Sequence, residues 1–271
     1  MECRGFPTRR CQPRATLHVL AFVLSLLLPG AFAGSASAQT NLVKNGDFSK
    51  IVVSPGGTPS SFQFGSGYTS AETLSDWSTS GYNFVFLPNT ADVGGAIGNA
   101  GTVKLWGPND NGGIANGLPT ASPTGTNFVA ADGAYQVSAI TQQVSGLIVG
   151  QKVAVSFAWA GAQQSGFTGP TTDEWTVDLG NSPAQTTSLL SLPSHGASGW
   201  INQTFTFVAT SSTELLSFLA TGTPSGQPPF ALLANVSVTN VPEPASLLML
   251  LTALAGLTGV VRRRSTHPRT A

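Results

Sequence analysis

Three carboxylates close together in the sequence are the strongest candidates for acid–base chemistry. Asp173 and Glu174 are adjacent, and Asp178 follows a short distance along the chain. The alternation of apolar and polar residues around them predicts a strand, which places Glu174 and Asp178 on one face and Asp173 on the other. Two carboxylates about 5–10 Å apart can hydrolyse a glycosidic bond. The simpler interpretation is a solvated strand face, and we favour it, so no catalytic residue is predicted.

Two further polar features could bind or activate a ligand. His195 is the only histidine between residues 39 and 241, and its Pro-Ser-His-Gly context is typical of a loop, where a solvated side chain is expected. The sequence Asn-Asp-Asn-Gly-Gly at 109–113 offers the oxygen ligands that hard cations prefer, although a glycine-rich turn explains it without metal. The usual motifs for serine hydrolases, phosphate loops, dinucleotides and zinc are absent. No cofactor and no metal site are therefore predicted.

Exposed aromatic side chains could stack against sugar rings. Trp159 and Trp175 are in phase with aliphatic neighbours and are expected in a core. Trp77 and Trp106 adjoin loops and are the better candidates for exposure and for contact with a glycan, although packing remains the commoner role of each. The other aromatic candidates are Tyr82 and Trp200.

The elements that must position these residues are predicted to be strands. Alternation with a period of two is clearest at residues 151–160, 174–179, 205–207 and 230–239. Shorter candidates are residues 41–48, 82–87, 102–106, 127–130, 134–144 and 214–221. Turn-rich stretches separate them at 54–67, 107–125, 161–172 and 181–199. Roughly ten short strands with long polar loops predict an all-β fold, an antiparallel jelly-roll-like β-sandwich.

The end of the chain has a different organisation, with three features in a fixed order. An uncharged apolar segment at 245–261 is about 26 Å long as a helix, near the lower limit for crossing a bilayer. The prolines before it place the helix start just after them. The arginines after it remain cytoplasmic, so everything before Pro242 is expected outside. The flanking residues are Pro242, Glu243 and Pro244 on one side, and Arg262, Arg263 and Arg264 on the other.

This three-part tail resembles the PEP-CTERM sorting signal of exopolysaccharide-producing Gram-negative bacteria. The resemblance implies recognition and processing by a membrane protease of the exosortase type. It also implies export through the inner membrane to the cell envelope, the cell surface or the extracellular matrix. The alternative is a plain anchor that is never cleaved and stays in the inner membrane. The Pro-Glu-Pro sequence at the outer boundary of the helix favours the processed signal.

The other end of the chain predicts export as well. A basic region with four arginines is followed by an apolar stretch at 17–28 and then by small residues. Residues 31–33 (Ala-Phe-Ala) and 36–38 (Ala-Ser-Ala) both fit a signal-peptidase site. We favour the second, with Ala36 and Ala38, so that cleavage after Ala38 would leave Gln39 first. The expected organisation is a signal peptide at 1–38, a β-sandwich domain at 39–240 and a sorting tail at 241–271.

Removal of both ends changes the charge of the protein. All eight arginines lie in the targeting segments, which leaves four lysines against ten carboxylates between residues 39 and 241, a net charge of −6. A domain so poor in basic groups cannot neutralise phosphates, so nucleic acid is excluded as a partner. Both cysteines, Cys3 and Cys11, lie in the signal peptide, so the mature domain has neither disulfide nor thiolate metal site.

A second resemblance concerns the domain itself. The opening sequence Asn-Leu-Val-Lys-Asn-Gly-Asp-Phe at 41–48 looks like the start of carbohydrate-binding jelly rolls with a galactose-binding-like fold. Segments at 142–147, 155–159, 161–164 and 232–238 look like a group of PEP-CTERM proteins that share this sandwich. Acids common in such domains are replaced by Ser49 and Ala234. Where those acids bind a structural calcium, their absence puts the calcium site in doubt.

Three functions follow as hypotheses. The first is a non-catalytic protein of the cell surface or exopolysaccharide matrix, and the second is a carbohydrate-binding module in the same setting. The third is a polysaccharide hydrolase that depends on Glu174 or Asp178. Tails of this type also occur on ice-binding proteins, but the threonines here are scattered rather than arrayed on one face. The expected partners are the exosortase-type protease, signal peptidase, exopolysaccharide and, before processing, the inner membrane.

Overall fold

The computed structural model describes residues 39–68, 70–110, 113 and 115–242. The chain divides into two units, Met1–Ala36 and Ser37–Ala271, and every described residue lies in the second. The predicted signal peptide and the predicted helix at 245–261 lie outside the described residues. Within the described part, no helix is long and apolar enough to cross a membrane.

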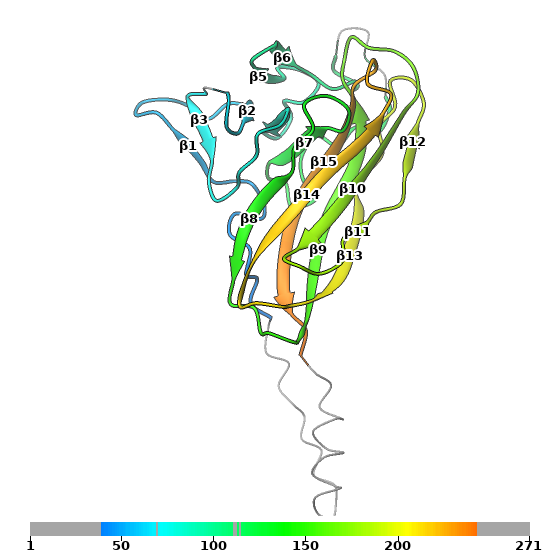
Figure 1. The fold of residues 1–271 in the computed structure, drawn as a ribbon. Coiled ribbons are helices and arrows are strands. Elements are labelled where there is room, and N and C mark those ends of the chain that lie inside the picture. The colour runs from blue at the N-terminus through cyan, green and yellow to red at the C-terminus, as the bar shows by residue number, and fades with distance from the viewer. Residues whose placement is uncertain (1–38, 69, 111–112, 114, 243–271) are drawn as a thin grey trace, which may run out of the picture. The chain divides into compact units, whose positions relative to one another are not determined.

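The described domain is built from strands in two large sheets (Figure 1). The eight-stranded sheet has the order β13-β9-β15-β7-β4-β2-β5-β6, and the five-stranded sheet has the order β11-β10-β14-β8 with β12 also paired to β10. Neighbours are antiparallel except β2 and β5. In the eight-stranded sheet the bounds are β2 Phe62–Phe64, β4 Asn83–Phe86, β5 Ala96–Gly98, β6 Gly101–Val103, β7 Phe128–Asp132, β9 Lys152–Gln163, β13 Ile201–Val208 and β15 Pro229–Asn240. In the five-stranded sheet they are β8 Ile140–Ser145, β10 Thr171–Leu179, β11 Gln185–Thr186, β12 Leu190–Leu192 and β14 Thr213–Thr223.

A separate two-stranded sheet pairs β1 (Ile51–Val53) with β3 (Glu72–Leu74). The predicted all-β sandwich is thus confirmed for the described residues. The predicted strands at 151–160, 174–179 and 230–239 correspond to β9, β10 and β15, each longer in the structure than in the prediction.

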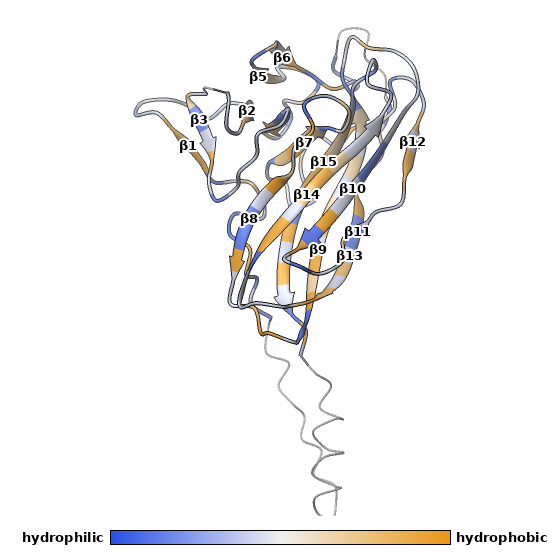
Figure 2. Ribbon diagram, in the orientation of Figure 1, coloured by the Kyte–Doolittle hydropathy of each residue, from blue (hydrophilic) through white to orange (hydrophobic). Residues whose placement is uncertain are grey.

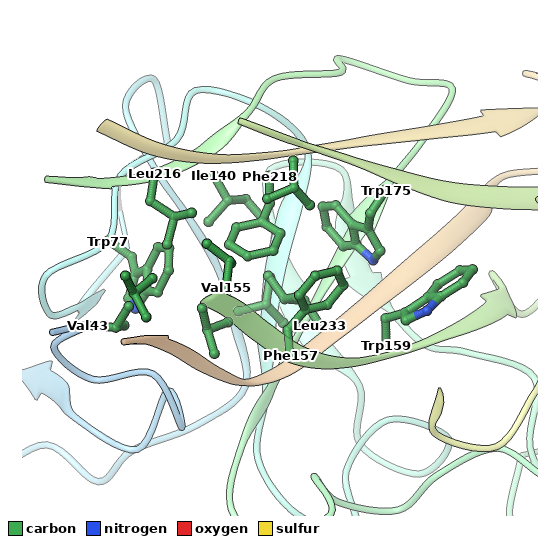
Figure 3. Close-up of a cluster of buried hydrophobic side chains, with 14 of the residues drawn as sticks. Val43, Trp77, Ile140, Val155, Phe157, Trp159, Trp175, Leu216, Phe218 and Leu233 are labelled. Atoms are coloured by element: carbon green, nitrogen blue, oxygen red, sulfur yellow. The ribbon is translucent and has the colours of Figure 1, made fainter. Parts of the chain in front are cut away.

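The main core lies between the two large sheets. Along β10 every second side chain is buried, which is the period that the sequence predicts for a strand with one face in a core. Trp159 of β9 and Trp175 of β10 are 1% and 0% exposed, so both are core residues as predicted. Figure 3 shows both tryptophans in one cluster with Phe157, Phe218 and Leu233. The ring of Trp175 lies 6.1 Å from that of Phe218. Figure 2 shows the matching alternation of hydrophobic and hydrophilic residues along β8, β10 and β14.

A second core covers the other face of the eight-stranded sheet. Small and aromatic residues of β4, β7, β9 and β15 face it, and they pack against residues of the long segment 87–127. Trp200 closes one side, because its indole Nε1 donates a hydrogen bond to the carbonyl oxygen of Ala121 at 2.8 Å. Ala158, Ala160 and Ala162 of β9 are all buried there. This sheet is therefore buried on both faces over much of its width.

The opening segment at 41–48 is not a strand, contrary to the prediction. Asn45 and Phe48 have positive φ angles of 49° and 55°, which break the extended conformation. The segment still closes on β15, since the amide of Leu42 donates to the carbonyl of Val238 and the amide of Val236 donates to the carbonyl of Gly46. A Cβ at Gly46 would lie 2.0 Å from the Val236 oxygen, so only glycine permits this approach.

Other strand boundaries also differ from the prediction. The segment predicted as a strand at 134–144 becomes one only at Ile140, where β8 begins, because residue 136 adopts a positive φ of 45° in the preceding turn. The strands β2, β11 and β12 lie within stretches predicted as turns. Each has two or three residues, too few to show alternation. The strand predicted at 102–106 is shorter and is β6.

Candidate functional site

A groove of about 710 Å³, with both apolar and hydroxyl-bearing lining residues, lies beside β2, β3 and the start of β8. Its floor includes the buried side chains of Phe64, Leu74 and Trp77. Its walls are rich in hydroxyl groups, which come from Ser66, Thr73, Ser78, Ser80, Ser138 and Thr141. The positive φ turn before β8 brings residue 138 against residue 80, and the two serine oxygens are 2.8 Å apart. The volume is in the range of small-molecule and sugar sites.

A second hollow of about 400 Å³ adjoins the first. The two share Gln63, Ser66, Tyr68, Ser80 and Ser138, so they form one continuous surface, called here the hydroxyl groove. Tyr68 is half-buried, and its hydroxyl donates a hydrogen bond to the carbonyl of Ile97 at 3.3 Å. The ring therefore stands at the boundary between the two hollows.

The hydroxyl groove contains one carboxylate and no cation among its described lining residues. The carboxylate is Glu72, whose two oxygens accept hydrogen bonds from Ser60 at 2.6 Å and from Ser70 at 2.9 Å. Both oxygens are thus held by the protein itself. The groove has the composition of a binding surface for an uncharged polar molecule.

Trp77 is buried, so it has the packing role that the sequence gives as the commoner one, and it is not available for stacking on a glycan. It is 5% exposed, and its indole Nε1 donates to the carbonyl of Asn45 at 2.9 Å. Its ring packs 5.3 Å from that of Phe48 and 6.3 Å from that of Phe218. The chain after β3 joins the sandwich through a bridge between Ser78 and Thr141, which carries Trp77 into the core (Figure 3).

Trp106 lies at a different place, among loops. Its indole Nε1 donates to the carbonyl of Phe167 at 2.8 Å, and its ring lies 4.1 Å from that of His195. The backbone amide of His195 donates to the side chain of Gln163 at 2.7 Å, and its Nε2 is buried without a partner among the described residues. The expectation that His195 is merely solvated is therefore wrong, because it packs on Trp106.

The sequence placed the carboxylates of β10 correctly. Glu174 and Asp178 face outward from the five-stranded sheet and are half-buried, whereas Asp173 faces inward and is 0% exposed. Neither oxygen of Asp173 has a hydrogen-bond partner among the described residues. Burial, and then the charge of Asp132, raise the pKa of Asp173 well above its usual range.

Asp132, at the end of β7, is the second buried acid of this region. One of its oxygens accepts hydrogen bonds from the amides of Ala134 at 2.8 Å and Tyr135 at 3.0 Å, and the other is buried without a partner among the described residues. Burial raises its pKa to about 6, although these two hydrogen bonds act in the opposite direction. Sequence reasoning missed this pair of acids, because their proximity depends on how the two sheets pack.

The described polar side chains of the sequence at 109–113 bond to other residues of the domain. Asn109 donates to Asp92 through both its amide and its side chain, and Asp110 pairs with Lys104 at 2.6 Å. No group of three or more His, Cys, Asp or Glu side chains in the described part of the chain is placed to hold a metal ion. These contacts fit the turn interpretation.

The two ends of the described domain lie together. The side chain of Gln39 donates to the carbonyl of Asn240 at 2.8 Å, and the last described residue, Pro242, is exposed. The residues around and after this end match a known sorting motif. Residues 240–264 match the PEP-CTERM protein-sorting motif. The chain carries this sorting motif. Its residues from Glu243 onward lie outside the described part of the structure.

No curated protein matches this sequence. Among solved structures, TmCBM61 in complex with β-1,4-galactotriose is 12% identical with a TM-score of 0.39, and the match covers 75% of this chain and 100% of that one. The CBM22-1 xylan-binding domain of Paenibacillus barcinonensis Xyn10C is 14% identical with a TM-score of 0.34, covering 78% and 100%. Arabinose-bound MgGH51 α-L-arabinofuranosidase is 14% identical with a TM-score of 0.39, covering 77% and 27%. At these TM-scores the similarity assigns neither ligand nor reaction to this chain.

Proposed function

We propose that the chain is an exported, non-catalytic protein of the cell surface or exopolysaccharide matrix. The sorting motif at 240–264 carries this proposal. The motif begins where the sandwich ends, and Pro242 is exposed, so a membrane protease would reach the boundary without opening the fold. An exosortase-type protease would act there, and signal peptidase would act between Ala38 and Gln39.

The intact mass of the protein from its own cells, recorded with the cell fraction, tests this proposal. A chain that begins at Gln39 and ends between Pro242 and Ala245, in the envelope or the medium, is the expected result. Replacement of Pro242 and Pro244 by alanine should leave the tail attached and the protein in the inner membrane. A wild-type mass that extends to Ala271 would instead identify a permanent anchor.

Carbohydrate binding is the second candidate function, and the hydroxyl groove favours it. Hydroxyl and amide side chains above an apolar floor are the groups that recognise a sugar, because they donate and accept hydrogen bonds. The test is saturable binding of polysaccharide extracted from the producing cells. Trp106 does not line the groove, so loss of binding on Trp106→Ala would place the contact at the loops around Trp106 instead.

A further inference from the structure

We infer that the hydroxyl groove binds an uncharged segment of polysaccharide. The inference rests on the proposed carbohydrate binding and deepens it, by naming the site and the class of sugar. It goes beyond the sequence, which pointed to Trp77 and Trp106 as isolated aromatic contacts.

The eight-stranded sheet has one face on the main core and the other on the second core, and this other face is closed to a ligand over β4, β7, β9 and β15. The side chains that this face presents are buried in the second core, to which Ala91, Leu105 and Leu118 contribute and against which Trp200 packs. Phe84, Phe128 and Phe230, which would form an aromatic platform, are each 0% exposed. A sugar chain therefore cannot lie across these strands unless the second core opens.

The hydroxyl groove is open and is built from separate parts of the chain. Residues of β2, of β3 and of the turn before β8 meet there, so its shape depends on the fold and not on one loop. Ser80 and Ser138 contact each other at 2.8 Å, yet each hydroxyl retains capacity to bond a ligand. Phe64 and Trp77 line the groove from beneath but are only 3% and 5% exposed, so hydrogen bonds from the hydroxyl groups, and not stacking on a ring, would hold the sugar.

The charge of the groove selects against acidic sugars. Among the described residues that line the two hollows, Glu72 is the one carboxylate, and there is no lysine, arginine or histidine. The domain between residues 39 and 241 carries a net charge of −6. A uronic acid or a sulfated sugar would meet repulsion without a cation to offset it. The ligand is therefore an uncharged stretch of glycan.

The experiment uses the full chain in a detergent without a sugar head group, because a glycosidic detergent would compete for the site. Polysaccharide from the producing cells is separated on an anion exchanger into a neutral and an acidic fraction. Binding is followed by calorimetry and by the fluorescence of the tryptophans, one of which, Trp77, lies in the groove floor.

Two groove variants have matched controls on the opposite part of the domain. Ser80→Ala with Ser138→Ala removes a hydroxyl pair, and Ser80→Trp fills the groove. The controls are Ser156→Ala with Thr204→Ala, which removes an exposed pair 2.9 Å apart between β9 and β13, and Thr204→Trp. Thermal unfolding establishes that each variant is folded before its binding is measured.

The expected result is saturable binding of the neutral fraction, weakened roughly tenfold by the double alanine variant and abolished by Ser80→Trp, with the controls unchanged. Binding of the acidic fraction alone, or wild-type binding by the folded groove variants, would overturn the inference and leave carbohydrate binding in place. Binding of neither fraction would overturn both, while the intact mass would still decide the sorting proposal independently.

Discussion

The buried acids Asp132 and Asp173 are the least expected residues of this domain. Burial penalises the charged form of a carboxyl group, and it raises the pKa of Asp173 and, despite the two backbone hydrogen bonds to one oxygen, the pKa of Asp132. The stability contributed by the protonated forms is fully present below about pH 4, where the unfolded chain is protonated too. It is lost as the pH rises through about 6, the folded pKa of Asp132.

We therefore expect the free energy of unfolding to fall by on the order of 1 to 2 kcal/mol between pH 5 and pH 8 because of Asp132. Asp132→Asn keeps an oxygen for the amides of Ala134 and Tyr135 and removes the ionisation. Urea denaturation across this range should show a flatter pH profile for the variant and greater stability at pH 8. Asp178→Asn, on the outward face of β10, is the control. Equal slopes for Asp132→Asn and the wild type would contradict this account.

At the scale of elements, β9 is the strand on which both cores depend. It pairs with β15 and β13, it presents Val153, Val155 and Phe157 to the core between the sheets, and it presents Ala158 and Ala160 to the second core. Alanine at these positions leaves room for the segment 87–127 to approach the sheet. Alternation in the sequence identifies this face of β9 as small or polar, and the structure buries the face at one end and leaves it half-buried at the other.

Ala160→Leu is expected to destabilise the domain by about 1 to 3 kcal/mol, because an enlarged side chain overpacks the second core. The matched control is Ala154→Leu, which lies on the same face of β9 where that face is only half-buried, and its effect should stay within about 0.5 kcal/mol. Chemical denaturation of both variants measures the difference. Comparable small effects would mean that the covering segment yields easily and that the sheet face is more accessible than we infer.

At the scale of the whole domain, the first and last described segments hold each other. Residues 42 and 46 exchange hydrogen bonds with β15, and Phe48 is 0% exposed in the main core. The opening segment is thus part of the sandwich although it forms no strand. Because the tail begins after this closure, its removal should leave the fold intact.

The fragment 39–241 is expected to fold, and the fragment 49–241 is expected to lose at least about 3 kcal/mol of stability, since it lacks Val43 and Phe48. The control is 41–241, which lacks only the exposed residues Gln39 and Thr40. Thermal unfolding compares the three. Equal stability of 49–241 and 39–241 would show that the opening segment is dispensable.

The sequence by itself determined the class of fold and the sorting motif, because both depend on local order. Alternation shows which face of β9, β10 or β15 is apolar, and the Pro-Glu-Pro, helix and arginine order is read directly from consecutive residues. It also placed Trp159 and Trp175 in the core and separated Asp173 from Glu174. These inferences need only the geometry of one strand.

Tertiary structure alone decided the burial of Trp77, the electrostatic effect of Asp132 on Asp173, the second core and the hydroxyl groove. Each depends on segments far apart in the chain, as when residue 138 reaches residue 80 or segment 87–127 covers β9. The residue pattern of a single strand shows that the side chains on one face are small or polar, but it does not show which segment packs on that face. Serines such as Ser80 and Ser138, and alanines such as Ala158 and Ala160, have no sequence pattern that distinguishes a groove from a core. The packing of the segments around them decides which of the two they form.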